Sequence, residues 1–128
     1  MAIALKHERW LLSASAALSE FAADGEFDLV REIVDVFLSD SQGKVDSLQK
    51  SVRAGDFAEA RRTAHSLKGA ASQMGLLRMA EDAERLERSP AEIGTAAISS
   101  LVLAIQERWS ETKQSMIETR DSLPSSQT

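Results

Sequence analysis

The sequence predicts an all-α protein, an antiparallel up-down four-helix bundle with an additional N-terminal helix. Apolar residues recur every three or four positions through most of the chain, which is the spacing of helices that bury one face. Strand signals are scarce, because the chain has no tyrosine and no sustained alternation of apolar and polar residues. Short breaks containing glycine, aspartate or proline separate the helical segments, and such connections favour antiparallel neighbours.

The first two helical segments are an N-terminal helix within residues 1–24 and a long helix over about residues 26–53. We interpret the first as an amphipathic helix rather than a secretory signal, because its apolar positions Leu11, Ala14, Leu18 and Phe21 keep helical spacing. The apolar stripe of the long helix stays in phase past Gly43, so one helix is expected that can bend there. This stripe consists of Phe27, Val30, Val34, Phe37, Ser41, Val45, Leu48 and Val52.

Capping signals define the next two helices. Gly55 suits the left-handed position after the long helix, and Asp56 is expected to cap a helix that runs to Gly75. Glu59, three residues after Asp56, would complete a capping-box pair. A shorter helix follows at 76–88, with Leu76, Ala80, Ala83 and Leu86 on one side.

The last helix is expected to begin at "SPAE", with Ser89 as N-cap, Pro90 at the first helical position and Glu92 at the third. Residues 121–128 are predicted to form a flexible tail. The chain is therefore expected to hold a single domain over residues 1–120, with the bundle core at 26–119. The inward positions of the last helix are Ile98, Leu101, Ile105, Trp109, Thr112 and Met116.

Composition excludes several classes of protein. The 128 residues include 43% hydrophobic and 27% charged residues, values typical of a globular domain. The net charge of −5 argues against general nucleic-acid binding, and no apolar run approaches the ~20 residues that a membrane span requires. The absence of cysteine excludes disulfides and thiolate metal sites and is compatible with a cytoplasmic location.

The helix over residues 57–75 has two contrasting faces when its residues are placed 100° apart. One face is small or apolar and is expected to pack inward. His65 lies on the opposite face, at the centre of a cationic stripe. The inward set is Ala60, Thr63, Ala64, Leu67, Ala70, Ala71 and Met74; the outward set is Ala58, Arg61, Arg62, His65, Lys68, Gly69 and Ser72.

This outward face suits phosphoryl chemistry. An exposed imidazole is largely neutral near pH 7, and a neutral ring nitrogen is a nucleophile that needs no separate base. Gly69, at i+4, leaves open the space that a side chain would occupy beside His65, although it costs the helix about 1 kcal/mol relative to alanine. Lys68 is placed to neutralise phosphoryl oxygens, and Arg61 to do the same or to steer an anionic partner.

The segment "AHSLKGAASQMGL" resembles the signature of histidine-containing phosphotransfer (HPt) domains, with His65, Leu67, Lys68, Gly69 and Gly75 at the matching positions. The preceding "GDFAEARRTA" and the helix "FDLVREIVDVFLSD" are similar to the same family, so the resemblance covers about residues 26–115. It implies a four-helix bundle that carries a phosphoryl group on His65, with Lys68 assisting the phosphoryl oxygens and Gly69 giving access.

The resemblance also implies the partners. They would be response-regulator receiver domains, which exchange the phosphoryl group with an aspartate, and a hybrid histidine kinase is a further candidate. Two positions depart from the family pattern: Ala70 stands where some members have serine, and Glu87 where some have glutamine near the histidine. A stabilising role for these two positions is therefore left open.

Partner docking would also need residues beyond the phosphoryl site. The predicted partner-binding residues are Arg61, Arg62 and Ser72 on the histidine helix and Leu29, Ile33 and Val36 on the long helix. The last three form a second apolar stripe, and packing under the N-terminal helix is an equally good interpretation of it.

No ATP-binding, kinase or zinc-binding motif is present in the sequence. We therefore expect a phosphoryl carrier rather than an enzyme, without cofactor or metal of its own, because Mg²⁺ would reside in the receiver. The alternative is a phosphorylation-silent helical module that docks and sequesters a receiver or kinase; the presence of both His65 and Lys68 disfavours it. The initiating methionine favours a free-standing protein, expected to be monomeric, over a domain of a larger hybrid kinase.

Overall fold

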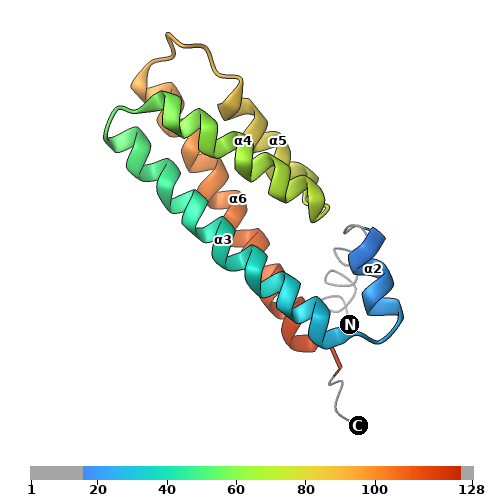
Figure 1. Cartoon of the computed structure of the whole chain (residues 1–128). Helices are drawn as coiled ribbons and strands as arrows, with labels where there is room; N and C mark the ends of the chain where they lie inside the picture. Colours follow the sequence, from blue (N-terminus) through green and yellow to red (C-terminus); the bar gives the residue numbers. More distant parts are fainter. Residues whose placement is uncertain (1–15, 125–128) are drawn as a thin grey trace.

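The computed structural model describes residues 16–124, with side chains from residue 20 onward. These residues are helical with no strand among them, which confirms the all-α prediction (Figure 1). Within the same range no helix is long and apolar enough to cross a membrane. The predicted positions Leu11 and Ala14 lie outside the described residues. The helices are α2 (Ala16–Ala23), α3 (Phe27–Arg53), α4 (Phe57–Gln73), α5 (Leu77–Glu87) and α6 (Thr95–Ser122).

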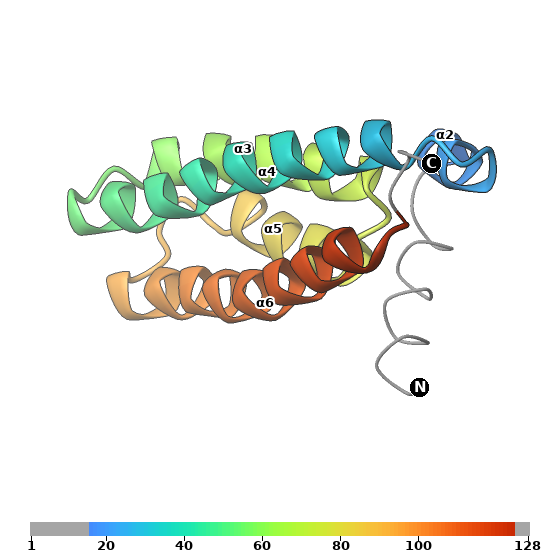
Figure 2. The same ribbon diagram turned by 90° about the horizontal axis from the view of Figure 1, so that it is seen from below.

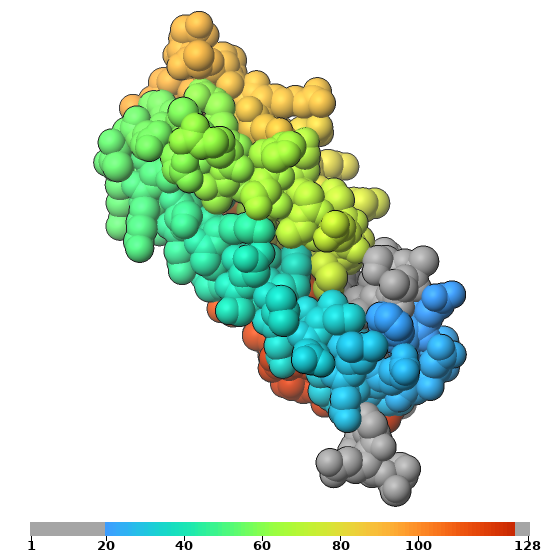
Figure 3. All heavy atoms as spheres, in the orientation of Figure 1, coloured from blue at the N-terminus to red at the C-terminus, as the bar shows by residue number. Residues whose placement is uncertain are grey.

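Helices α3 to α6 lie alongside one another as an elongated bundle, in which each helix runs opposite to the one before it (Figures 1 and 2). The contacting pairs close a ring, because α3 packs against α4 and α6, and α5 also packs against α4 and α6. Helix α2 contacts the N-terminal end of α3. The space-filling view shows α3 and α4 side by side along one face of the molecule (Figure 3).

Three glycines make the tight turns that join α2, α3, α4 and α5. Gly25, Gly55 and Gly75 have φ angles of 78°, 73° and 72°, a left-handed conformation that glycine adopts without steric cost. After α3, the Gly55 N–H donates to the Val52 carbonyl at 3.0 Å and the Asp56 N–H to the Ser51 carbonyl at 2.8 Å. This is the Schellman arrangement, and it confirms the turn positions expected for Gly55 and Gly75.

The core is the apolar interior of this ring of helices. In α3 the predicted stripe is buried from Val30 to Leu48, including Ser41, and the helix continues unbroken through Gly43. Phe37 and Trp109 pack edge to face with ring centroids 6.0 Å apart, and the Trp109 indole N–H donates to Gln42 Oε1 at 2.9 Å. Trp109 is therefore a packing residue that fixes α6 against α3.

The beginning of α6 differs from the prediction. The helix begins at Thr95 with Gly94 as N-cap, not at Ser89 and Pro90. The Ser89 hydroxyl donates to the Leu86 carbonyl at 2.7 Å and thus closes the end of α5, while a turn joins the Ile93 N–H to the Pro90 carbonyl at 3.1 Å. The Ser89–Pro90 helix start was wrong because Ser89 closes the preceding helix and Pro90 lies in the turn that follows it.

The end of α6 also extends past the predicted boundary. The domain was predicted to end at residue 120, whereas the helix continues through Ser122. The residue after the helix is held by Arg31, whose Nη2 donates to the Leu123 carbonyl at 2.8 Å. Residues 125–128 of the predicted tail lie outside the described range.

Candidate functional site

Helix α4 carries the histidine and starts as the sequence predicts, at Asp56. The Asp56 carboxylate accepts a hydrogen bond from the Glu59 backbone N–H at 3.1 Å. The second half of the predicted capping box is wrong: the Glu59 side chain pairs with Arg62 at 2.6 Å, and the Asp56 N–H is already bound to the Ser51 carbonyl. The cap therefore comes from Asp56 alone.

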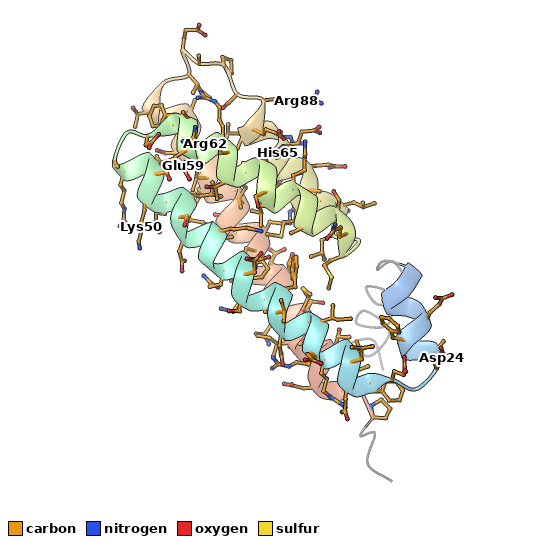
Figure 4. The ribbon with its side chains drawn as sticks, in the orientation of Figure 1. Asp24, Lys50, Glu59, Arg62, His65 and Arg88 are labelled. Carbon is orange, nitrogen blue, oxygen red and sulfur yellow. The ribbon has the colours of Figure 1, made fainter. Side chains whose placement is uncertain are left out.

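The burial pattern of α4 leaves His65 on the outside of the bundle. Ala60, Ala64, Leu67 and Ala71 are fully buried against α3 and α5, and they share the face opposite the histidine. The His65 side chain is 69% exposed. Figure 4 shows it on the outer side of α4, near the end of α5 that carries Arg88. A partner molecule can therefore reach the ring directly.

One nitrogen of the ring is engaged by α5. The Nδ1 atom of His65 bonds to Oε1 of Glu87, the last residue of that helix. The other carboxylate oxygen of Glu87, Oε2, lies 2.6 Å from the Lys68 ammonium. One carboxylate thus contacts both predicted site residues of α4, and a stabilising role for Glu87 stays a prediction.

The charges around Glu87 decide which nitrogen of His65 is free. The Lys68 ammonium, and after it the His65 ring, hold the pKa of the Glu87 carboxyl below its ordinary value. Glu87 is therefore ionised at neutral pH and can only accept hydrogen bonds. In the neutral ring the one N–H group is then at Nδ1, and Nε2 is unprotonated with a free lone pair.

The predicted cationic stripe exists, but each of its members already has a partner within the chain. Lys68 pairs with Glu87 and Arg62 with Glu59. Arg61 donates from Nε to the carbonyl and hydroxyl oxygens of Ser89, at 3.1 Å each, and from Nη2 to the Pro90 carbonyl at 2.6 Å. These residues surround a shallow open depression lined by Arg61, Arg62, His65 and Glu87.

Gly69 has no packing reason to be glycine. It is exposed in the interior of α4, its φ is not positive, and a Cβ atom built on it would meet no atom within 4 Å beyond its own helix backbone. The space beside Gly69 is therefore open, and its role in giving access to His65 stays a prediction. Ser72, further along α4, is also exposed, whereas Ala70 is half-buried and packs against the core.

The three apolar residues predicted for docking differ in their surroundings. Ile33 packs against the core and Leu29 is half-buried, while Val36 is 65% exposed. His65 on α4 and Val45 on α3 are equally far in sequence from Gly55, so they lie level with one another in this antiparallel pair. Val36 is nine residues further from the turn, which is about 14 Å along the axis of α3. Val36 therefore lies near the C-terminal end of α4, and its role in docking stays a prediction.

Metal binding has no obvious place in the described part of the chain. Residues 16–124 contain no group of three or more histidine, aspartate or glutamate side chains arranged to hold an ion. Glu87, the carboxylate nearest His65, is occupied by Lys68 and the ring.

Comparison with known families agrees with this geometry. A family model described as the Hpt domain matches residues 32–115, and the chain therefore belongs to the Hpt domain family. Hpt domains are phosphocarrier modules of two-component phosphorelays that interact with receiver domains and kinases. Comparison with curated proteins gave no match, and comparison with solved structures gave none either.

Proposed function

We propose that this protein carries a phosphoryl group on Nε2 of His65 between the aspartates of receiver domains. The observation that supports this most strongly is the state of the imidazole: it is exposed, and its Nδ1 atom is bound to an ionised Glu87. The ring is thereby held in the tautomer whose outward nitrogen has a free electron pair. An outward nucleophile on a rigid helix is what an incoming aspartyl phosphate requires.

The transfer step is a substitution at phosphorus. The Nε2 lone pair forms the N–P bond, the bond between phosphorus and the partner's aspartate oxygen breaks, and its electrons leave on the aspartate carboxylate. Nδ1 keeps its proton, so the ring becomes cationic. Glu87 then faces a positive ring through the same contact it makes in the resting protein, which stabilises the phosphorylated state.

Lys68 would act on the phosphoryl oxygens. Its ammonium lies against Glu87 Oε2 in the resting protein, so it is kept one turn from His65 on the same face. The arriving phosphoryl group offers a second set of anionic oxygens, and a flexible lysine can contact both groups. Transfer onward to a second receiver reverses the substitution, with that receiver's aspartate as the nucleophile.

The remaining parts of the reaction are assigned to the partner. The carrier would need no cofactor or metal, and Mg²⁺ would be held by the receiver. The docking surface would include Arg62 beside the ring and, further along the bundle, Ser72 of α4 and Leu29, Ile33 and Val36 of α3. A monomer in the cytoplasm is the expected state of the carrier.

The test is transfer from a phosphorylated receiver domain to the purified protein. Label that is labile in acid and stable in alkali should appear on the wild type and be absent from His65→Gln. Lys68→Ala should slow transfer while leaving the fold intact, because partly exposed ion pairs contribute little to stability. A wild-type protein that binds the receiver without taking label would instead be a phosphorylation-silent docking module.

A further inference from the structure

An arginine of α4 binds the α5–α6 connection. Arg61 precedes His65 by one helical turn on the same face, and its guanidinium binds backbone and side-chain oxygens of Ser89 and the backbone oxygen of Pro90. These oxygens lie two and three residues after Glu87, the carboxylate that holds His65. Arg61 and Glu87 therefore both connect α4 to the same end of α5, and both line the depression together with Arg62 and His65.

Glu87 stands at a position where a carboxylate is poorly placed unless something holds it. It is the last residue of an 11-residue helix, where the carbonyl groups lack partners within the helix and the helix dipole disfavours negative charge. Helix ends fray most readily, so the carboxylate needs its backbone fixed if it is to keep contact with His65. Arg61 meets both needs, because it brings a positive charge to this end and binds the chain just beyond it.

The hydrogen bonds of Ser89 link Arg61 to the last turn of α5, which contains Glu87. The Ser89 hydroxyl accepts from Arg61 Nε and donates to the Leu86 carbonyl at 2.7 Å, and the Ser89 N–H donates to the same carbonyl at 3.1 Å. Leu86 is fully buried in the core. Glu87 is thus fixed on one side by a buried residue and on the other by a serine that Arg61 holds against α4.

We propose that Arg61 is a positioning residue that sets the tautomer of His65 by holding the end of α5, and with it Glu87, against α4. This inference rests on the proposed carrier function, because the tautomer matters only if Nε2 is the nucleophile. Without the anchor, Glu87 leaves Nδ1 for part of the time. The ring proton then moves to Nε2, the nitrogen that carries it in most unrestrained neutral imidazoles, and the nucleophilic lone pair is lost in those molecules.

The experiment measures the tautomer by NMR of ¹⁵N-labelled protein, at a pH where the ring is neutral, and the transfer rate on the same samples. Wild type should have its proton on Nδ1, whereas Arg61→Ala should show a large share of the Nε2–H form. Transfer from a phosphorylated receiver should fall about three- to fivefold, in proportion to the loss of the competent tautomer. Arg61→Lys keeps the charge but not the planar donor fork, so it should resemble Arg61→Ala.

Arg62→Ala is the matched control for the tautomer. It removes the neighbouring positive charge, but Arg62 pairs with Glu59 of its own helix, and no hydrogen bond or ion pair joins it to α5 among the described residues, so the tautomer should stay as in wild type. A second control places Arg61→Ala in a Glu87→Ala background, which has no side-chain acceptor for Nδ1. If Arg61 acts through Glu87, the substitution should change the tautomer no further there.

A folded Arg61→Ala protein with the wild-type tautomer would overturn the proposal, and slower transfer in that protein would assign Arg61 to direct contact with the partner or the phosphoryl group. If Arg61→Ala does not fold, Arg61→Lys and Ser89→Ala decide the question by the same NMR measurement. Failure of the wild type to accept phosphoryl would refute the carrier function, whereas the tautomer result tests the role of Arg61 independently.

Discussion

Replacing Gly69 with alanine should make the protein more stable and the carrier slower. Gly69 lies in the interior of α4, is exposed, and has room for a Cβ atom with no neighbour within 4 Å beyond its own helix backbone. No steric strain therefore offsets the helix-propensity gain of about 1 kcal/mol that alanine has over glycine. For a domain of this size, that gain corresponds to a rise of about 4 °C in the melting temperature.

The same methyl group would lie one helical turn from His65, on the face that a receiver is proposed to approach. Displacing the incoming phosphoryl group by a fraction of an ångström to one ångström is expected to slow transfer about tenfold. Thermal unfolding and single-turnover transfer, measured on one preparation, separate the two effects. Gly43→Ala is the matched control for stability, since Gly43 is also an exposed helix residue with no atom within 4 Å of its Cβ position. A stabilised Gly69→Ala protein with the wild-type transfer rate would refute the access argument.

Three further predictions concern the scaffold and its charges. Gly75→Ala places a side chain at a φ of 72° and should lower the free energy of unfolding by about 1–2 kcal/mol in urea titrations; an unchanged midpoint would contradict this. Asp82, 6% exposed, binds Arg108 Nε at 2.9 Å, so Asp82→Ala should destabilise by about 1–3 kcal/mol, and a neutral effect would mean that the pair is dispensable. Because the folded-state pKa of Glu87 is lowered, its stabilising contribution is complete above the ordinary glutamate pKa and is lost as pH falls through the lowered value. Urea unfolding of wild type and Glu87→Gln should therefore differ at neutral pH and converge in acid, whereas a gap that widens in acid would reverse the sign.

Much of the fold could be predicted because its signals are local. The apolar spacing of α3 and the glycines at 55 and 75 depend on residues close in sequence, and the structure confirms them. The start of α6 failed for the opposite reason. Ser89 and Pro90 have the composition of a helix start, but the Ser89 hydroxyl donates to the Leu86 carbonyl, and oxygens of both residues accept from Arg61, which is distant in sequence.

One part of the site could likewise be predicted from local sequence, and another part could not. The exposure of His65 follows from the phase of α4, which the sequence contains. The contact with Glu87 depends on how α5 packs against α4 across 22 residues, and no local pattern encodes that distance. The resemblance to the family indicated the position of residue 87 but not its role. Some members have a neutral glutamine there, whereas Glu87 is ionised and accepts a hydrogen bond from Nδ1 of the ring.

The most direct test of the account is to identify the atom that takes the phosphoryl group. The protein, labelled with ¹⁵N in its histidine ring, would be phosphorylated by a receiver domain and examined by ³¹P and ¹⁵N NMR. One phosphoryl group is expected on Nε2 of His65, with the proton retained on Nδ1. Label on Nδ1, on any other residue, or on no residue at all would contradict it.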